Sequence, residues 1–131
     1  KKAAEIVKPD VVIVIDSLAA RDIDRVSTTI QLTDTGIQPG SGMGNHRAGI
    51  NEENIGVPEI AIGVPKVIDI KTILRDALDE NLDSAEAVEK YLSDYDSQMI
   101  VTSTDIDILV KDFSDIIADG INKTLHPGIY S

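Results

Sequence analysis

Residues 9–16 read Pro-Asp-Val-Val-Ile-Val-Ile-Asp, and this stretch decides the fold. From Val11 to Ile15 it is a continuous run of β-branched side chains with no polar interruption. Such a run is typical of a parallel strand that is covered on both faces. Asp16 ends the run, and ligands in open α/β sheets bind at the carboxyl ends of strands. The run therefore predicts a layered α/β fold and makes Asp16 the first candidate for chemistry.

Further strands and helices are predicted on either side of this run. The other predicted strands are residues 28–32, residues 59–64 between two prolines, and a brief one at residues 99–101. The predicted helices are residues 1–8, 67–82, 84–92 and a last helix capped by Ser103 or Thr104. The apolar stripe of that last helix is Ile106, Leu109, Val110, Phe113, Ile116, Ile117 and Ile121. Early strands followed by helices predict a single α/β domain over residues 1–131.

Composition excludes several classes of protein. The chain has no cysteine, which excludes disulfides, thiol catalysis and Cys-ligated metals. Its formal net charge of -11 repels phosphate backbones, so we predict no direct nucleic-acid partner. No stretch is apolar enough for a membrane span or a signal peptide, and we predict neither a membrane partner nor any location but the cytoplasm.

Two carboxylates follow predicted strands and are candidates for acid–base work. Asp16 can act as a general base or a metal ligand, or it can simply cap an element that begins at Ser17. Asp34 follows the second strand and could share a proton with Asp16 if the two strands adjoin. An Asx turn that opens the following loop is an equal alternative for Asp34. The residues alone leave both questions open.

The loop over residues 33–56 is rich in glycine. Gly40, Ser41, Gly42 and Asn45 are its candidate substrate-facing or supporting residues, because glycine lets a backbone approach another chain closely. A phosphate cradle is weakly supported, since no G-x-G-x-x-G or Gly-Lys-Ser/Thr pattern occurs. A purely structural cluster of turns is the alternative. His46 could join Asp16 at a metal, but two ligands are too few for a zinc site, so we predict no metal and no cofactor.

Three long segments resemble the germination protease family of endospore-forming bacteria. They are KPDVVIVIDSLAARDIDRVSTTIQLTDTGIQPGSGMGN at 8–45, IGVPEIAIGVPKVID at 55–69 and MIVTSTDIDILVKDFSDIIADGINKTLHPGI at 99–129. The ordered motifs I-D-S-L-A-A-R, T-D-T-G-I-Q-P-G-S-G-M-G-N and A-I-G-V-P make the resemblance specific. Only residues 80–98 fall outside it.

The resemblance implies an aspartic-type endopeptidase that degrades small acid-soluble spore proteins during germination. It also implies a zymogen, a homo-tetramer when full length, a location in the spore core, and a three-layer α/β/α fold similar to the hydrogenase-maturation endopeptidases. Of the two catalytic aspartates of the family, one corresponds to Asp16. The other belongs to a T-P-D-A-L-G-P motif, which does not occur in these residues.

The resemblance therefore identifies residues 1–131 as the C-terminal portion of a longer α/β domain. We expect this portion alone to be inactive, because a carboxylate pair needs both members. Two alternatives stay open at this point. A metal-dependent maturation-type peptidase would use Asp16 as a ligand, and a non-catalytic oligomerisation or regulatory module would only keep the fold.

Overall fold

The computed structural model describes residues 1–40, 48–79, 85–94 and 99–130. Its strands form one mixed four-stranded sheet with β3 (Glu59–Asp69) at the centre. On one side β3 pairs in parallel with β1 (Val12–Ala20). On the other side it pairs antiparallel with β2 (Gln31–Thr33) and β4 (Ile100–Thr102). The predicted α/β class and the sheet of three or four strands are confirmed.

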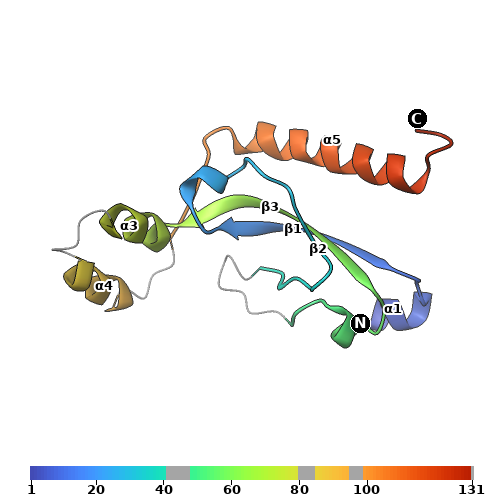
Figure 1. Ribbon diagram of the computed structural model, residues 1–131, viewed down its shortest axis with the longest axis horizontal. Coiled ribbons are helices and arrows are strands. Elements are labelled where there is room, and N and C mark those ends of the chain that lie inside the picture. The colour runs from blue at the N-terminus through green and yellow to red at the C-terminus, as the bar shows by residue number, and fades with distance from the viewer. Residues whose placement is uncertain (41–47, 80–84, 95–98, 131) are drawn as a thin grey trace.

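Helices lie on both sides of this sheet (Figure 1). The long helix α5 (Ile106–Leu125) runs along one side, and the short helices α1 (Lys2–Val7) and α2 (Glu52–Ile55) lie on the other. The pair α3 (Ile70–Asp79) and α4 (Ala85–Asp94) projects from the end of the sheet remote from α1. The predicted C-terminal helices are confirmed, whereas the likeness to hydrogenase-maturation endopeptidases stays a prediction.

The two long strands continue past the points where the sequence predicts their ends. β1 runs four residues beyond Asp16, and β3 passes through Pro65 to Asp69. Proline lacks a backbone N–H, so it is tolerated in a strand mainly at edges and bulges. A bulge lies here, because Leu18 pairs with Pro65 while Ala19 pairs with Val67. The prediction that Asp16 ends its strand is therefore wrong, and the carboxylate lies within the strand.

The predicted edge strand at residues 28–32 lies later in the chain than expected. β2 covers only Gln31–Thr33, and all three residues are exposed. A left-handed residue, Ser27 with φ of 55°, precedes it. The backbone N–H of Ser27 donates to the Pro65 carbonyl at 2.6 Å, so residues 27–30 are held beside the bulge rather than in the ladder.

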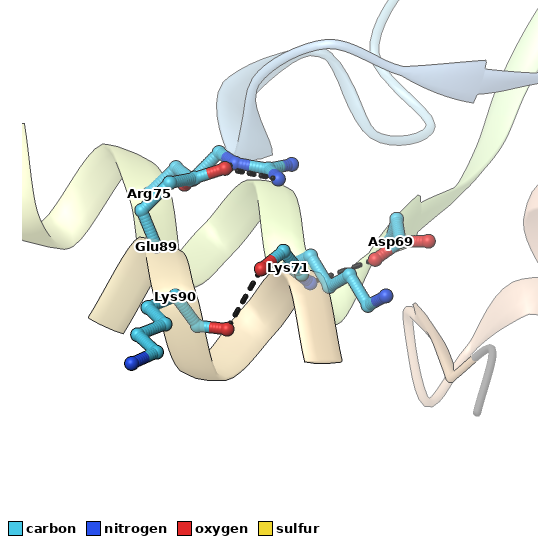
Figure 2. Close-up of polar contacts among 6 residues, drawn as sticks. Asp69, Lys71, Arg75, Glu89 and Lys90 are labelled. Carbon is cyan, nitrogen blue, oxygen red and sulfur yellow. Dashed lines mark hydrogen bonds and ion pairs between the residues drawn. The ribbon is translucent and has the colours of Figure 1, made fainter. Parts of the chain in front are cut away.

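An ion pair joins α3 to α4, and α4 carries a buried leucine. α3 begins at Ile70 rather than at residue 67, because Val67 to Asp69 pair with β4. Leu92 of α4 is 2% exposed. Arg75 makes two hydrogen bonds to the Glu89 carboxylate, both at 2.9 Å (Figure 2). The Asp69 side chain accepts a 2.7 Å bond from the Lys71 N–H and so caps the start of α3.

Helix α5 covers the sheet only in part. Its predicted apolar stripe includes Ile116, but that residue is 57% exposed, and no residue of α5 is buried. The predicted Ser103 or Thr104 cap is also wrong. Asp105 takes the N-cap position without a side-chain cap bond, and the Ser103 hydroxyl donates to the Asp105 carboxylate instead. Among the described residues, no helix has the length and hydropathy needed to cross a membrane.

Candidate functional site

Asp16 lies in the middle of β1, directly opposite Gly63 of the central strand. Its side chain is half-buried, and its Oδ2 accepts a hydrogen bond from the Gly40 N–H at 3.3 Å. Gly40 has a φ of 73°, a left-handed conformation that glycine adopts at little cost. This contact joins two motifs that are 24 residues apart in the chain. The loop that follows β2 therefore folds back onto Asp16.

Gly63 makes room on the sheet face that carries the Asp16 side chain. A Cβ atom added at Gly63 would overlap the Leu18 side chain, whose nearest atoms occupy that space. Leu18 and Asp16 are two residues apart on β1 and thus share a face. The small residue opposite Asp16 lets Leu18 lie across β3 beside the carboxylate. Glycine in a central strand, a weakness in itself, has a packing reason here.

A cleft of about 310 Å³ lies on the opposite face of the sheet, between Ile15, Ser17 and Val64 and helix α5. Its apolar wall comes from α5, where Phe113 contributes the aromatic ring. Its polar lining includes Ser17, Ser27, Lys66 and Ser114. Lys66 is the extra residue of the β3 bulge and lines this cleft, whereas the Asp16 carboxylate and its Gly40 contact lie on the other face of the sheet. No ion pair within 4.0 Å joins these two residues, which are both described.

Sequence reasoning missed Ser27 and Lys66. The Ser27 hydroxyl is buried and has no hydrogen-bond partner among the described residues. Nothing in the sequence around Ser27 distinguishes it from its neighbours. Lys66, however, is the only charged residue between Glu59 and Asp69, and it directly follows a proline inside an apolar strand. That pattern is a usable signal for a bulge that redirects a side chain.

The structure does not bring Asp34 to Asp16. Strand order is β1-β3-β2, so the strands that precede the two residues do not adjoin, and the condition for a shared proton is not met. Asp34 is exposed. The adjacent turn is made by Thr33, whose hydroxyl accepts from the Thr35 N–H at 3.1 Å. Asp34 stays a prediction only as a residue at the start of the substrate-facing loop.

Part of the predicted site cannot be placed. Ser41, Gly42, Asn45 and His46 lie outside the described residues. His126 forms the C-cap of α5. Within residues 1–40, 48–79, 85–94 and 99–130, no three His, Cys, Asp or Glu side chains gather as metal ligands would.

Glu59 is a second carboxylate that sequence reasoning missed. It begins β3 opposite Val12, is 3% exposed, and neither of its oxygens has a hydrogen-bond partner among the described residues. Burial raises the pKa of this carboxyl above its ordinary value. Glu59 shares the sheet face of Gly63, but four residues of strand separate them by about 13 Å. Glu59 therefore does not form a proton-sharing pair with Asp16.

Comparison with known proteins matches the chain to one family. A family model described as germination protease matches residues 2–90. A germination protease of Clostridium perfringens (strain 13 / Type A) is 41% identical over 98% of this chain and 47% of its own length. That of Caldanaerobacter subterraneus subsp. tengcongensis is 42% identical with the same coverage. That of Halalkalibacterium halodurans is 31% identical over 93% of this chain and 47% of its own length.

The chain belongs to the germination protease family. The predicted resemblance is thereby confirmed, and a peptidase of spore germination is the activity that the family indicates. The chain spans about half the length of the curated relatives that it matches. The family model covers Asp16, Gly40, Gly63 and the bulge, whereas the α5 wall of the cleft lies beyond the matched residues.

Proposed function

We propose that this chain carries the Asp16 half of a carboxylate pair that hydrolyses peptide bonds in small acid-soluble spore proteins. The observation that supports it is the Asp16–Gly40 contact within a germination protease sequence. A carboxylate held by a backbone N–H stays oriented, and one oxygen stays open to a water molecule. Asp16 Oδ1 has no hydrogen-bond partner among the described residues, which suits a general base.

The chemistry needs a second acid. In an aspartic-type mechanism one carboxylate removes a proton from water while the other protonates the leaving amine. Within the described residues, no other carboxylate lies beside Asp16, since Asp34 and Glu59 are both placed elsewhere in the sheet. We infer that the second acid belongs to the T-P-D-A-L-G-P motif of the family, and that the working enzyme is a homo-tetramer in the spore core.

Lys66 and Ser27 have a supporting part in this proposal. Both line the cleft of about 310 Å³ beneath α5, on the sheet face opposite the Asp16 carboxylate. An unpartnered hydroxyl in this cleft can bond to a substrate carbonyl. They are positioning residues in this scheme, and the proton transfers belong to the carboxylates.

The test replaces Asp16 in the intact protease that contains this sequence. We expect Asp16→Asn to lower kcat on a purified small acid-soluble spore protein by about 100-fold or more, because the general base is removed. Asp10→Asn is the matched control, since Asp10 is exposed just before the same strand. Both variants must keep the wild-type melting temperature for the comparison to hold. Cleavage by Asp16→Asn at the wild-type rate would contradict the assignment.

A chelator separates the aspartic-type mechanism from a metal-dependent one. The aspartic-type reaction continues at its full rate in the presence of EDTA, because no metal-bound water takes part. Loss of activity with EDTA, restored by a divalent cation, would make Asp16 a metal ligand instead. Cleavage by the present chain alone would show that no second carboxylate from elsewhere is needed.

A further inference from the structure

One edge of β1 has no strand partner among the described residues, and its hydrogen-bonding groups can be assigned. The Val12 N–H donates to the Pro58 carbonyl at 2.9 Å. In a parallel ladder each residue directs both its N–H and its C=O to the same side, and successive residues alternate. Val12, Val14 and Asp16 therefore bond to β3, while Ile13, Ile15 and Ser17 direct both groups to the open edge.

The outward-bonding residues Ile13, Ile15 and Ser17 include none of the charges or prolines that usually protect an exposed strand. Proteins usually blunt such an edge with charges, prolines or bulges, or cover it. Here the three outward-bonding residues are two isoleucines and a serine, and Ile15 is 55% exposed. The sequence itself is that of a strand covered on both faces, as in the interior of a parallel sheet. An edge of this composition is one that pairs with another strand.

The space between the open edge of β1 and α5 can also accommodate side chains of a further strand. A pocket of about 300 Å³ lies between Ile15 and the face of α5. The residues of α5 that line it are Ser114, Ile117, Ala118, Ile121 and Asn122. A strand added beside β1 would direct alternate side chains toward α5 and so into this pocket. A mainly apolar side chain suits its walls.

Net charge and chain length indicate which strand pairs with the open edge of β1. A second copy of this chain also carries a net charge of -11, so self-pairing brings two strongly acidic bodies together. The matched germination proteases are about twice as long, and 47% of their length accounts for 98% of this chain. The remaining half of those relatives must pack against something, and the open edge is bordered by unfilled apolar space.

We propose that the open edge of β1 pairs with a β-strand from the part of the germination protease chain that has no counterpart here. The strand bonds to the N–H and C=O groups of Ile13, Ile15 and Ser17 and fills the pocket under α5. This makes β1 an internal strand and covers Ile15. The proposal does not depend on Asp16 being catalytic.

Amide exchange on a two-chain complex tests the pairing directly. This chain is co-expressed with the residues of the Clostridium perfringens (strain 13 / Type A) germination protease that lie outside the aligned 47%. Exchange is then followed by NMR in the chain alone and in the complex. We expect protection of the Ile13, Ile15 and Ser17 amides to rise roughly tenfold or more, while Val12 and Val14 are protected in both. No complex, or a complex without this alternation, would overturn the proposal.

A proline variant provides the second test. Ile15→Pro removes one outward N–H and leaves the bonds of Val14 and Asp16 to β3 intact. Ile15→Val is the matched control, because it keeps the N–H and a β-branched side chain. We expect Ile15→Pro to weaken the complex roughly tenfold or more and Ile15→Val to retain it. Equal affinity of the two variants would contradict the proposal. Should Ile15→Pro fail to fold, the exchange pattern of the wild-type complex decides alone.

Self-association is the rival outcome. Sedimentation of the chain alone across a range of salt concentrations distinguishes it. We expect a monomer at low salt, where like charges repel over the longest range. A dimer that protects the Ile13 and Ile15 amides by itself would assign the edge to a second copy and overturn the proposal.

Discussion

Asp16 and Glu59 are carboxylates on the same face of the same pair of strands, yet they have opposite surroundings. Asp16 is half-buried and accepts a bond from the Gly40 N–H. Glu59 is buried and has no partner among the described residues. A buried, unpartnered carboxyl is driven toward its neutral form. The comparison shows that position on a sheet face does not determine what a carboxylate can do.

Disturbing the packing beside Asp16 should have the largest effect on stability. Gly63→Ala puts a methyl group into the space of Leu18, and overpacking of this kind costs about 1–3 kcal/mol. The free energy of unfolding from urea titration measures the loss. Gly120→Ala is the control, because a Cβ there meets nothing within 4 Å and alanine favours the helix. A neutral Gly63→Ala would show that Leu18 moves aside freely.

Disturbing the hydrogen bond from the Gly40 N–H to Asp16 should have the second largest effect on stability. Gly40→Ala forces an L-residue to adopt a φ of 73°, which costs about 1–2 kcal/mol or displaces the N–H from Asp16. Gly49→Ala is the matched control, since an added Cβ at Gly49 makes only ordinary contacts, the nearest at 3.7 Å. The free energies of unfolding of the two variants, obtained from urea titration, should differ by this amount. Equal free energies of unfolding would mean that the loop adapts without strain.

Glu59 should show a pH-dependent effect of about 1 kcal/mol, since a buried unpaired polar group costs at least that much. Its raised pKa means that stability is fully present below about pH 4.3, the ordinary value, and falls as pH rises through the raised value. Glu59→Gln removes this loss, so the variant should be more stable than wild type at pH 8 and equal to it near pH 4.

The control for Glu59 is Glu53→Gln, because Glu53 is an exposed glutamate. Thermal unfolding of both variants across this pH range gives the comparison. If Glu59→Gln is less stable than wild type at pH 8, the ionised carboxylate must have a partner that stabilises it, and the contrast with Asp16 would disappear.

Replacing a third carboxylate, Glu89, should have the smallest effect on stability, with a pH dependence opposite to that of Glu59. The hydrogen bond from Arg75 lowers the pKa of the exposed Glu89 carboxyl. Its contribution is therefore present above about pH 4.3 and is lost as pH falls through the lowered value. Glu89→Gln should lower the melting temperature slightly at pH 7 and not at acid pH. Because exposed pairs are screened, added salt should reduce the difference.

Much of the fold follows from local patterns, and the exceptions have specific causes. The run from Val11 to Ile15 identifies β1, and apolar spacing identifies the three C-terminal helices, because burial acts on each of these segments directly. The predicted start of β3 at Glu59 is confirmed, whereas its predicted end at Val64 is wrong because proline is a strong local signal for a break. A bulge at Pro65 and pairing with β4 overrode that signal, and neither is visible before the strands are assembled.

Local sequence patterns likewise predict one part of the candidate site and not the other. Asp16 stands out in the sequence because a charged residue follows an unbroken apolar run. Its contact with Gly40 depends on a loop that returns over 24 residues, which no local pattern encodes. Glu59 was overlooked for a different reason. A glutamate between a proline and an apolar run is typical of a solvent-facing strand end, and its burial arises only in the assembled fold.

The bulge at Lys66 shifts the alternation of side chains along β3 by one residue. Before it, odd-numbered residues of β3 share the face of Asp16, whereas after it Ile68 pairs with Ala20 and even-numbered residues take that face. One extra residue thus exchanges the two sides of everything that follows. Deleting Lys66 alone would turn Ile68, now 1% exposed, toward the opposite side of the sheet. In this part of the chain the length of the sequence is as tightly constrained as its chemistry.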